Sequence, residues 1–533
     1  MSLRDAYLKA KGPHDMEAHA IDPANAFVPA CEQFERLVSR LSDEQTTRMT
    51  HAEVERLLQT EGTELLRRMF QGHLDARGGG ETAAQVVGSD GVERTHARFS
   101  ERDLETVFGT VRLARMGYGQ RGTDSLYPRD AELNVPPEKH SHGIRRRVAE
   151  EAARGSFDEV VDAISRTTGA EVAKRQVEEL AVRAAQDFDL FYQARAAASP
   201  KEANKMSPIL VLTVDGKGIT MRPEALREST RKAASERVRK LTKRLTKGEK
   251  TATRRMSTVA AVYTIGPLYR TPEDIVRDLG PVREVVDRPK PEHKRVWASI
   301  AHDPAVVIEQ LFDEAERRDP ERRKSWVALV DGNDTQLRLL KACAKRRGIT
   351  LAIIVDVIHV IEYLWKAAYC FHAEGTTEAQ TWVTKRLLEV LRGKASHVAA
   401  GIRRSATLRG LDAKQRDAAD VCADYLLKYR AHLDYDLSLQ AGLPIATGVI
   451  EGACRYLVKD RMDITGARWG LEGAEAVLRL RALRASGDFD SYWTFHEVRE
   501  HARHHATHYA GAPPPTVVPF RPSRHRRTHL RLV

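Results

Sequence analysis

Two short apolar runs separated by an amphipathic stretch form the clearest pattern in the chain. Residues 326–330 and 351–355 each have the composition of a buried strand, and an aspartate follows each run, Asp331 and Asp356. Between them, residues 337–347 place leucines and basic residues at helical spacing. The order strand, helix, strand predicts two parallel strands joined by a right-handed crossover. Ligands of open α/β sheets collect at the carboxyl ends of strands, where both aspartates lie.

Further strands are predicted upstream of this unit. Residues 208–214 (PILVLTV) are the most strand-like segment and end at Asp215, and Gly218 predicts a tight turn into a second strand. Residues 257–265 (STVAAVYTI) predict a third strand. The expected sheet therefore has three antiparallel-compatible strands followed by two parallel ones, and three aspartates at strand ends.

The remaining pattern is mainly helical and divides the chain into regions. We expect a mainly helical N-terminal region (1–122, with a strand or hairpin arm at 108–115), a helix-turn-helix-like DNA-binding region with its connector (123–200), the first part of an α/β catalytic domain (201–365), an all-helical insertion (366–441), the last part of the catalytic domain (442–495) and a basic flexible tail (496–533). In the last catalytic part, a helix should carry Glu451, Arg455 and Lys459 on one face.

Two basic stretches have both a structural and a DNA-binding interpretation. A helix, a turn at 167–170 and a second helix carrying Lys174 and Arg175 fit a DNA-reading helix-turn-helix, but also an ordinary helical hairpin. Residues 231–255 predict a dense basic helix, which is either a solvated surface helix or arm, or a contact to the phosphate backbone.

Composition narrows the class of protein. A net charge of +12 over 533 residues favours a polyanionic partner. The five cysteines include no C-x-x-C pair, so neither a zinc ribbon nor a disulfide framework is indicated. No apolar run approaches the roughly 20 residues of a membrane span, and the N-terminus lacks a signal-peptide core, so we expect a cytoplasmic protein with no membrane contact. No phosphate-binding P-loop and no H-E-x-x-H zinc motif occurs.

Three acids stand apart from ordinary surface charge: Asp215, Asp331 and Glu451. A ribonuclease H-like sheet would bring them together, from its first strand, its fourth strand and a late helix. Converging carboxylates repel one another and suit two Mg²⁺ ions, with Mn²⁺ as a substitute, which can drive an in-line phosphoryl displacement. Each aspartate also has a simpler interpretation as a turn residue.

A histidine close to the second parallel strand adds to this candidate site. His359 could orient a phosphate, act as an acid or base, or hydrogen-bond Asp356, and we favour the supporting role for this pair. Metal binding by His501, His504, His505 and His508 has little support, since no acid or cysteine accompanies them.

Five motifs surround the candidate acids and the strands before them: VDGKG at Asp215, RMSTVAAVYTIGPLYRTPEDIV after it, WVALVDG at Asp331, DVIHVIEYLW at Asp356 and TGVIEGACRYLVKDRMDITGARWG at Glu451. Together they resemble the ISKra-type family of bacterial insertion-sequence transposases, and the resemblance covers about residues 108–493. The resemblance implies a DDE transposase with a ribonuclease H-like catalytic domain, dependent on Mg²⁺ and acting on the inverted repeats of its own element. It implies that Asp215, Asp331 and Glu451 bind metal, and that Asp356 and His359 form a D-x-x-H signature. It also places Arg455, Lys459, Arg468 and Trp469 near the DNA end.

The predicted function is therefore Mg²⁺-dependent DNA cleavage and strand transfer, with double-stranded DNA ends and target as partners. A homo-oligomer is expected, because two DNA ends must be paired. Two alternatives stay open: a structure-selective nuclease of the same fold, which cuts without joining, and a non-catalytic DNA-binding protein derived from a transposase.

Overall fold

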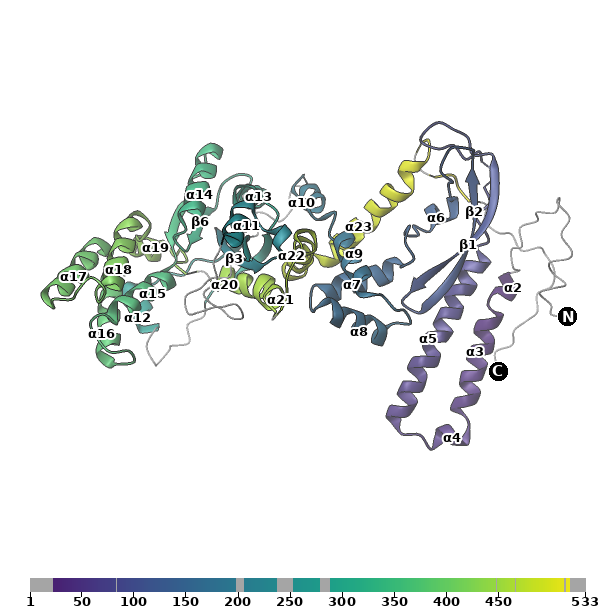
Figure 1. The fold of residues 1–533 in the computed structure, drawn as a ribbon, viewed down its shortest axis with the longest axis horizontal. Coiled ribbons are helices and arrows are strands. Elements are labelled where there is room, and N and C mark those ends of the chain that lie inside the picture. The colour runs from purple at the N-terminus through teal and green to yellow at the C-terminus, as the bar shows by residue number, and fades with distance from the viewer. Residues whose placement is uncertain are drawn as a thin grey trace. The chain divides into compact units, whose positions relative to one another are not determined.

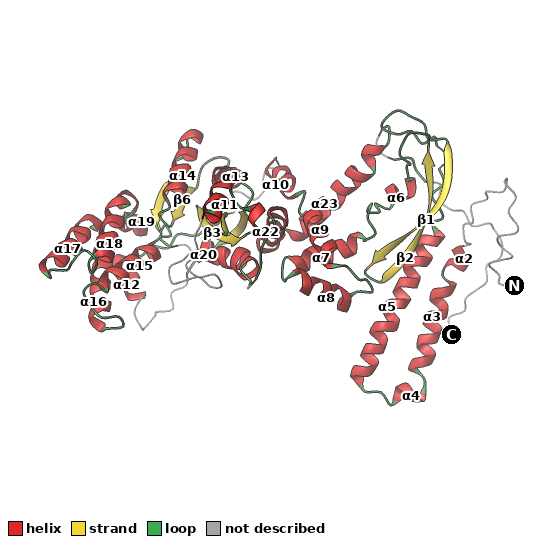
Figure 2. Cartoon of the chain, in the orientation of Figure 1, coloured by secondary structure: helices red, strands yellow, loops and turns green. Residues whose placement is uncertain are grey.

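The computed structural model describes residues 23–82, 84–197, 206–236, 253–278, 288–446, 448–464, 466–511 and 514–517. The chain forms two compact units. Unit 1 comprises the described residues up to Asp187 and those from Asp490 onward, and unit 2 is Phe188–Phe489. The structure is mixed α/β, and helical residues far outnumber strand residues in the described part (Figures 1 and 2).

Unit 1 begins with helices and continues into a two-stranded sheet. Helix α3 (Val28–Leu41) packs on α5 (His51–Ala76), which also contacts strand β2. Strands β1 (His96–Thr106) and β2 (Gly109–Gly119) are antiparallel, and Gly109 leaves the tight turn between them at a φ of 115°. The predicted strand near residues 108–115 is confirmed as one arm of this hairpin. Shorter helices are α2 (Pro23–Ala26), α4 (Glu44–Thr47) and α6 (Pro128–Glu132).

Three helices that contact one another follow the hairpin: α7 (His142–Ala152), α8 (Phe157–Thr167) and α9 (Lys174–Ala184). Helix α8 begins with a capping box, in which Ser156 and Glu159 satisfy each other's backbone amides. The predicted helices of this region are confirmed, with a longer turn between α8 and α9 than expected.

The predicted flexible tail is wrong in its first part. Helix α23 (Phe489–His504) extends well into that region, and a 3₁₀ turn follows it (η5, Ala506–His508). The rings of His501 and His505 hydrogen-bond the backbone carbonyls of Ala131 and Val135, each at 3.0 Å. These histidines are therefore structural contacts within unit 1. The terminal residues from 518 lie outside the described part of the chain.

Unit 2 is built on a five-stranded mixed sheet of order β5-β4-β3-β6-β7. Its strands are β3 (Ile209–Thr220), β4 (Arg254–Ile265), β5 (Glu292–Ser299), β6 (Ser325–Val330) and β7 (Ala352–Val355). Strand β4 pairs antiparallel with β3 and β5, whereas β6 is parallel to β3 and to β7. The central strands are apolar on both faces and buried, as expected for a covered sheet.

The predicted parallel unit is confirmed: helix α14 (Asp334–Arg347) connects β6 to β7. Asn333 caps its start by accepting from the amides of Thr335 and Gln336, and Gly348 ends it in the left-handed conformation.

The predicted turn after Gly218 is wrong, because β3 continues to Thr220 as a single strand paired along its whole length with β4. Its pairing with β6 stops earlier, at Thr213 opposite Leu329. Asp215 therefore lies inside a strand, just beyond the end of the parallel pairing, and not at the strand end that the apolar pattern suggested.

The region predicted as an all-helical insertion is helical. It follows α15 (Val357–Ala368) and contains α16 (Thr377–Leu391), α17 (Ala395–Leu408), α18 (Asp417–Lys428), η3 (Arg430–His432) and α19 (Tyr435–Gln440). Helix α18 packs against α15 and α17.

The last helices of unit 2 are α20 (Gly448–Ala453), a π-helical segment η4 (Cys454–Lys459), α21 (Asp460–Met462) and α22 (Leu471–Ser486). The others are α10 (Phe188–Ala197), η2 (Pro223–Ala225), α11 (Glu228–Ser235), α12 (Pro272–Asp278) and α13 (Pro304–Arg318). Of the predicted basic helix, 237–252 lie outside the described residues.

Candidate active site

The three acids singled out by sequence come from three elements of unit 2. Asp215 lies inside β3, Asp331 follows β6 directly, and Glu451 lies in α20. Burial raises the pKa of the Asp331 carboxyl, the backbone amide of Asn333 lowers it, and the negative charge of Asp215 raises it further. Because one charge acts on the other, the fold brings these two carboxylates to the same region.

Glu451 belongs to the same electrostatic neighbourhood. Partial burial raises its pKa, as do the charges of Asp356 and Asp215, whereas His359 lowers it. Acids from distant parts of the sequence therefore act on one another's ionisation here. In the described structure, however, the oxygens of Asp215, Asp331 and Glu451 do not all lie within 4.8 Å of one another.

The loop that carries Asp331 is held by the helical insertion. The Tyr425 hydroxyl on α18 donates to the backbone carbonyl of Asp331 at 3.1 Å, and the Tyr429 hydroxyl contacts the carbonyl of Gly332 and the Asp334 carboxylate. Gly332 adopts a φ of 93°, and a Cβ there would lie 3.1 Å from both the Tyr425 hydroxyl and a Tyr429 ring carbon. The two tyrosines thus fix the position of Asp331, a role that the sequence did not indicate.

Asp356 is buried and caps helix α15. Its carboxylate accepts from the amide of Ile358 at 2.8 Å, and its own amide donates to the carbonyl of Val330. His359 Nδ1 lies 3.7 Å from a Glu362 carboxylate oxygen, and its charge lowers the pKa of Asp331 as well as that of Glu451. The hydrogen bond expected between His359 and Asp356 stays a prediction.

Cys454 is a site residue that the sequence reasoning missed. Its buried thiol donates to Asp215 Oδ2 at 3.1 Å, while the Gly216 amide donates to Oδ1 of the same carboxylate. Burial and the Asp215 charge raise the pKa of this thiol, so it stays protonated at neutral pH. The available signal was its position one helical turn after Glu451.

The helix after Glu451 departs from the predicted α-helical face. Arg455 and Lys459 are exposed, as expected for DNA contacts, but they lie in the π-helical segment η4. Arg455 accordingly pairs with Asp460, five positions on, at 3.7 Å. Segments of this kind are frequent at functional sites.

Of the remaining predicted DNA contacts, one is corrected by burial. Trp469 is 6% exposed and its indole donates to the carbonyl of Met462 at 3.0 Å, so its ring packs inside unit 2 and is not available to DNA. Arg468 is exposed. Lys174 and Arg175 are exposed at the start of α9 in unit 1, where they pair with the nearby acids Asp158 and Glu179.

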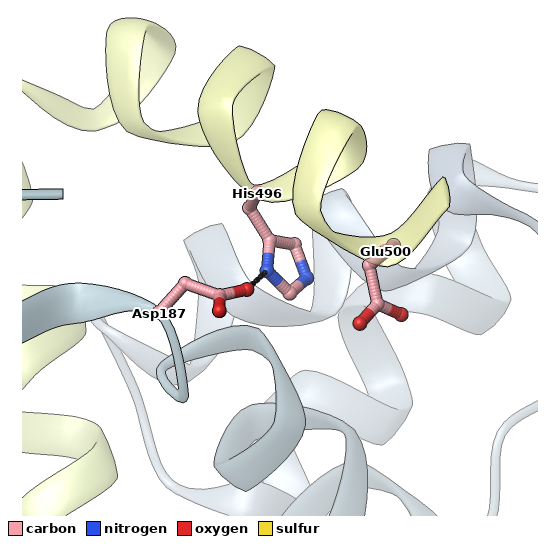
Figure 3. Close-up of side chains that lie close together, drawn as sticks. All are labelled: Asp187, His496 and Glu500. Atoms are coloured by element: carbon pink, nitrogen blue, oxygen red, sulfur yellow. Dashed lines mark hydrogen bonds and ion pairs between the residues drawn. The ribbon is translucent and has the colours of Figure 1, made fainter. Parts of the chain in front are cut away.

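Among the described residues, a different group has possible ligand atoms that all lie within 4.8 Å of one another: Asp187, His496 and Glu500 in unit 1 (Figure 3). His496 Nδ1 lies 2.7 Å from a carboxylate oxygen of Asp187. The Arg503 guanidinium lies 2.5 Å from the other oxygen of Asp187, and the Arg145 guanidinium lies 2.5 Å from Glu500. Burial raises the pKa of Asp187, but its bonds to His496 and Arg503 lower it below the ordinary value overall. The two arginines already balance the two acids, so this is an ion-pair network that holds α23 in unit 1.

Comparisons with known proteins add little to this geometry. No protein-family model and no curated protein sequence matches the chain. Among solved structures, the chain is similar to the Drosophila P element transposase strand transfer complex, with 11% identity over 71% of this chain and 81% of the other. The TM-score is 0.23, too low for any argument about function. None of the described helices combines the length and the apolarity that a membrane crossing requires.

Proposed function

We propose that this protein is a DDE transposase that cuts DNA at the ends of its own element and joins those ends to target DNA. The observation that supports it is that the charge of Asp215 acts on the ionisation of both Asp331 and Glu451. Numbered along unit 2, the strand order is 3-2-1-4-5, and the acids come from the first strand, the end of the fourth and a late helix. That is the arrangement expected of a ribonuclease H-like catalytic domain.

The donors present fit Mg²⁺. They are carboxylate oxygens, the ligands that this hard cation prefers. Burial is the main cause of the raised pKa values of Asp331 and Glu451, and the negative charge of Asp215 adds to both, a repulsion that a cation would relieve. Asp215, Asp331 and Glu451 would hold the metal. When bound, two Mg²⁺ ions would activate the attacking oxygen and stabilise the leaving oxygen.

The surrounding residues would orient the reacting groups. Cys454 and the Gly216 amide fix both oxygens of Asp215, and Tyr425 of α18 with Tyr429 just after it fixes the backbone at Asp331 and Gly332. The exposed side chains of Arg455, Lys459 and Arg468 would contact phosphates of the DNA end.

The test uses purified protein and duplexes carrying the DNA that flanks its gene. Asp215→Asn, Asp331→Asn and Glu451→Gln should each abolish Mg²⁺-dependent cleavage, because each removes one metal-binding charge, while DNA binding persists. Glu378→Gln, an exposed acid on α16, is the matched control and should cleave normally.

Normal cleavage by any of the first three variants would refute the assignment of that acid. Strand transfer is read from products that join element DNA to target DNA. Cleavage without joined products would favour the nuclease, and binding without cleavage by the wild-type protein would favour the non-catalytic DNA-binding protein.

A further inference from the structure

A cavity of about 350 Å³ lies at the end of the unit 2 sheet that is remote from Asp331. It is lined by residues at the start of β5 and the end of α13, among others. Strand β5 is antiparallel to β4, and β4 is antiparallel to β3, so β5 runs in the same direction as β3 and β6 and begins at the same end of the sheet. Asp215 and Asp331 lie toward the other end, where β3 and β6 finish.

The lining carries an excess of positive charge. Its basic side chains are Arg195, Lys294, Arg295, Arg317 and Arg318, with His293 beside them, and its acids are Glu314 and Asp488. Glu314 is shared by three arginines, at 2.9 Å from Arg295 and 2.7 Å from each of Arg317 and Arg318. Asp488 pairs with Arg195 at 2.5 Å. Five cations thus face two carboxylates, which leaves three positive charges unbalanced.

The pKa of Arg318 shows that the charged arginines in this cluster repel one another. Burial lowers the pKa of Arg318, and the charges of Arg317 and Arg295 lower it further, against the opposing effect of Glu314. Burial would raise the pKa of Glu314, but the neighbouring arginines lower it well below its ordinary value. Glu314 is therefore ionised, and its single negative charge is shared among three arginines. A further anion in the cavity would stabilise these cations.

One lining residue has donors that no described acid uses. Lys294 has no ion-pair partner in the described part of the chain, and its Nζ lies 5.5 Å from the centre of the Tyr456 ring. Arg295 beside it is 8% exposed, stacks on the Tyr192 ring and pairs with Glu314. The ammonium donors of Lys294 are therefore available to a ligand in the cavity.

We propose that this cavity binds phosphate groups. Arginine guanidinium groups match phosphate oxygens in pairs, and a lysine beside them adds a point charge. The volume lies within the range of about 300–1,000 Å³ that is typical of small-molecule sites. The phosphates come either from an oligophosphate small molecule or from a DNA backbone, and the site is independent of the three catalytic acids.

The test is calorimetric titration of the full-length protein with tripolyphosphate. Wild type should bind, and Lys294→Gln and Arg317→Gln should each bind about tenfold more weakly, the factor expected for one lost charge-assisted hydrogen bond. Arg338→Gln, an exposed cation on α14 outside the cavity, is the matched control, and Asp331→Asn should bind like wild type. Lys294 makes no described ion pair, so its variant keeps the test valid even if Arg317→Gln unfolds.

No binding by wild type, or equal weakening by Arg338→Gln, would overturn the proposal, as would unchanged binding by Lys294→Gln. Once tripolyphosphate binds as expected, competition identifies the source of the phosphates. Displacement of tripolyphosphate by a short duplex assigns the cavity to a DNA backbone, and simultaneous binding of both assigns it to a small oligophosphate.

Discussion

Gly332→Ala tests whether the helical insertion positions the catalytic loop. The new Cβ would lie 3.1 Å from the Tyr425 hydroxyl and 3.1 Å from the Tyr429 ring, at a φ of 93°. The left-handed backbone costs about 1–2 kcal/mol for a residue with a Cβ, and loss of one tyrosine hydrogen bond costs about 1 kcal/mol more. We therefore expect a loss of about 2–3 kcal/mol in the free energy of unfolding.

We expect an effect on catalysis of similar size in free energy, and it should be measurable in the fraction of the protein that stays folded. A displacement of about 1 Å at a reacting group can cost on the order of 10²-fold in rate, and Asp331 is attached directly to the displaced residue. Unfolding in urea gives the stability, and Mg²⁺-dependent cleavage of an end-bearing duplex gives the activity.

Gly375→Ala is the matched control for Gly332→Ala. Gly375 has a φ of 79° in the loop after α15, and a Cβ there would meet no atom within 4 Å. Gly375→Ala should lose only the free energy of unfolding that a left-handed backbone costs, about 1–2 kcal/mol, and should keep the wild-type cleavage rate. If Gly332→Ala cleaves like wild type and is no less stable than Gly375→Ala, then the tyrosines do not position Asp331.

Four further predictions concern titration and buried contacts. Because the pKa values of Asp331 and Glu451 are raised, Mg²⁺-dependent cleavage should begin to fall at a higher pH than for ordinary carboxylates as the solution is acidified, which a pH–rate profile at fixed Mg²⁺ checks. In metal-free protein the folded state holds these protons more tightly than the unfolded state, so stability should fall as pH rises through the raised pKa values, and Asp331→Asn should flatten that slope in thermal unfolding. Cys454→Ala should weaken Mg²⁺ activation of cleavage by freeing Asp215, and Cys454→Ser should restore it; equal Mg²⁺ dependence in both variants would exclude an orienting role. His496→Ala should cost about 1–3 kcal/mol in unfolding free energy by removing a hydrogen-bond donor to the buried Asp187 carboxylate, while chelators leave wild-type stability unchanged; a fall on chelation would point to a bound metal.

Sequence patterns predicted the parts of the sheet that depend on local signals. The unit β6-α14-β7 is predicted by two apolar runs, by leucines at helical spacing between them and by Gly348, which ends the helix. Each of these signals depends only on residues that are close together in the sequence. The extension of β3 through Gly218 could not be predicted in the same way, because its polar residues are held in a strand only by pairing with β4.

The candidate site shows the same division between local and tertiary information. Asp215 and Asp331 stand out because each follows a buried apolar run. Tyr425, Tyr429 and the thiol of Cys454 act through contacts between residues about a hundred or more positions apart, and no pattern along the chain marks such contacts. The motif assigns Trp469 to DNA, whereas in the fold its backbone pairs with that of Met221 and its ring is buried.

Unit 1 takes its last helix from a part of the chain that follows all of unit 2. On a ribosome, Phe188–Phe489 is a continuous segment and can fold as soon as it has emerged, whereas Asp187 must wait for His496 and Arg503 before its charge is balanced. A chain that stops early, through a frameshift or a premature stop codon near its end, would therefore carry an intact sheet and an unfinished first unit.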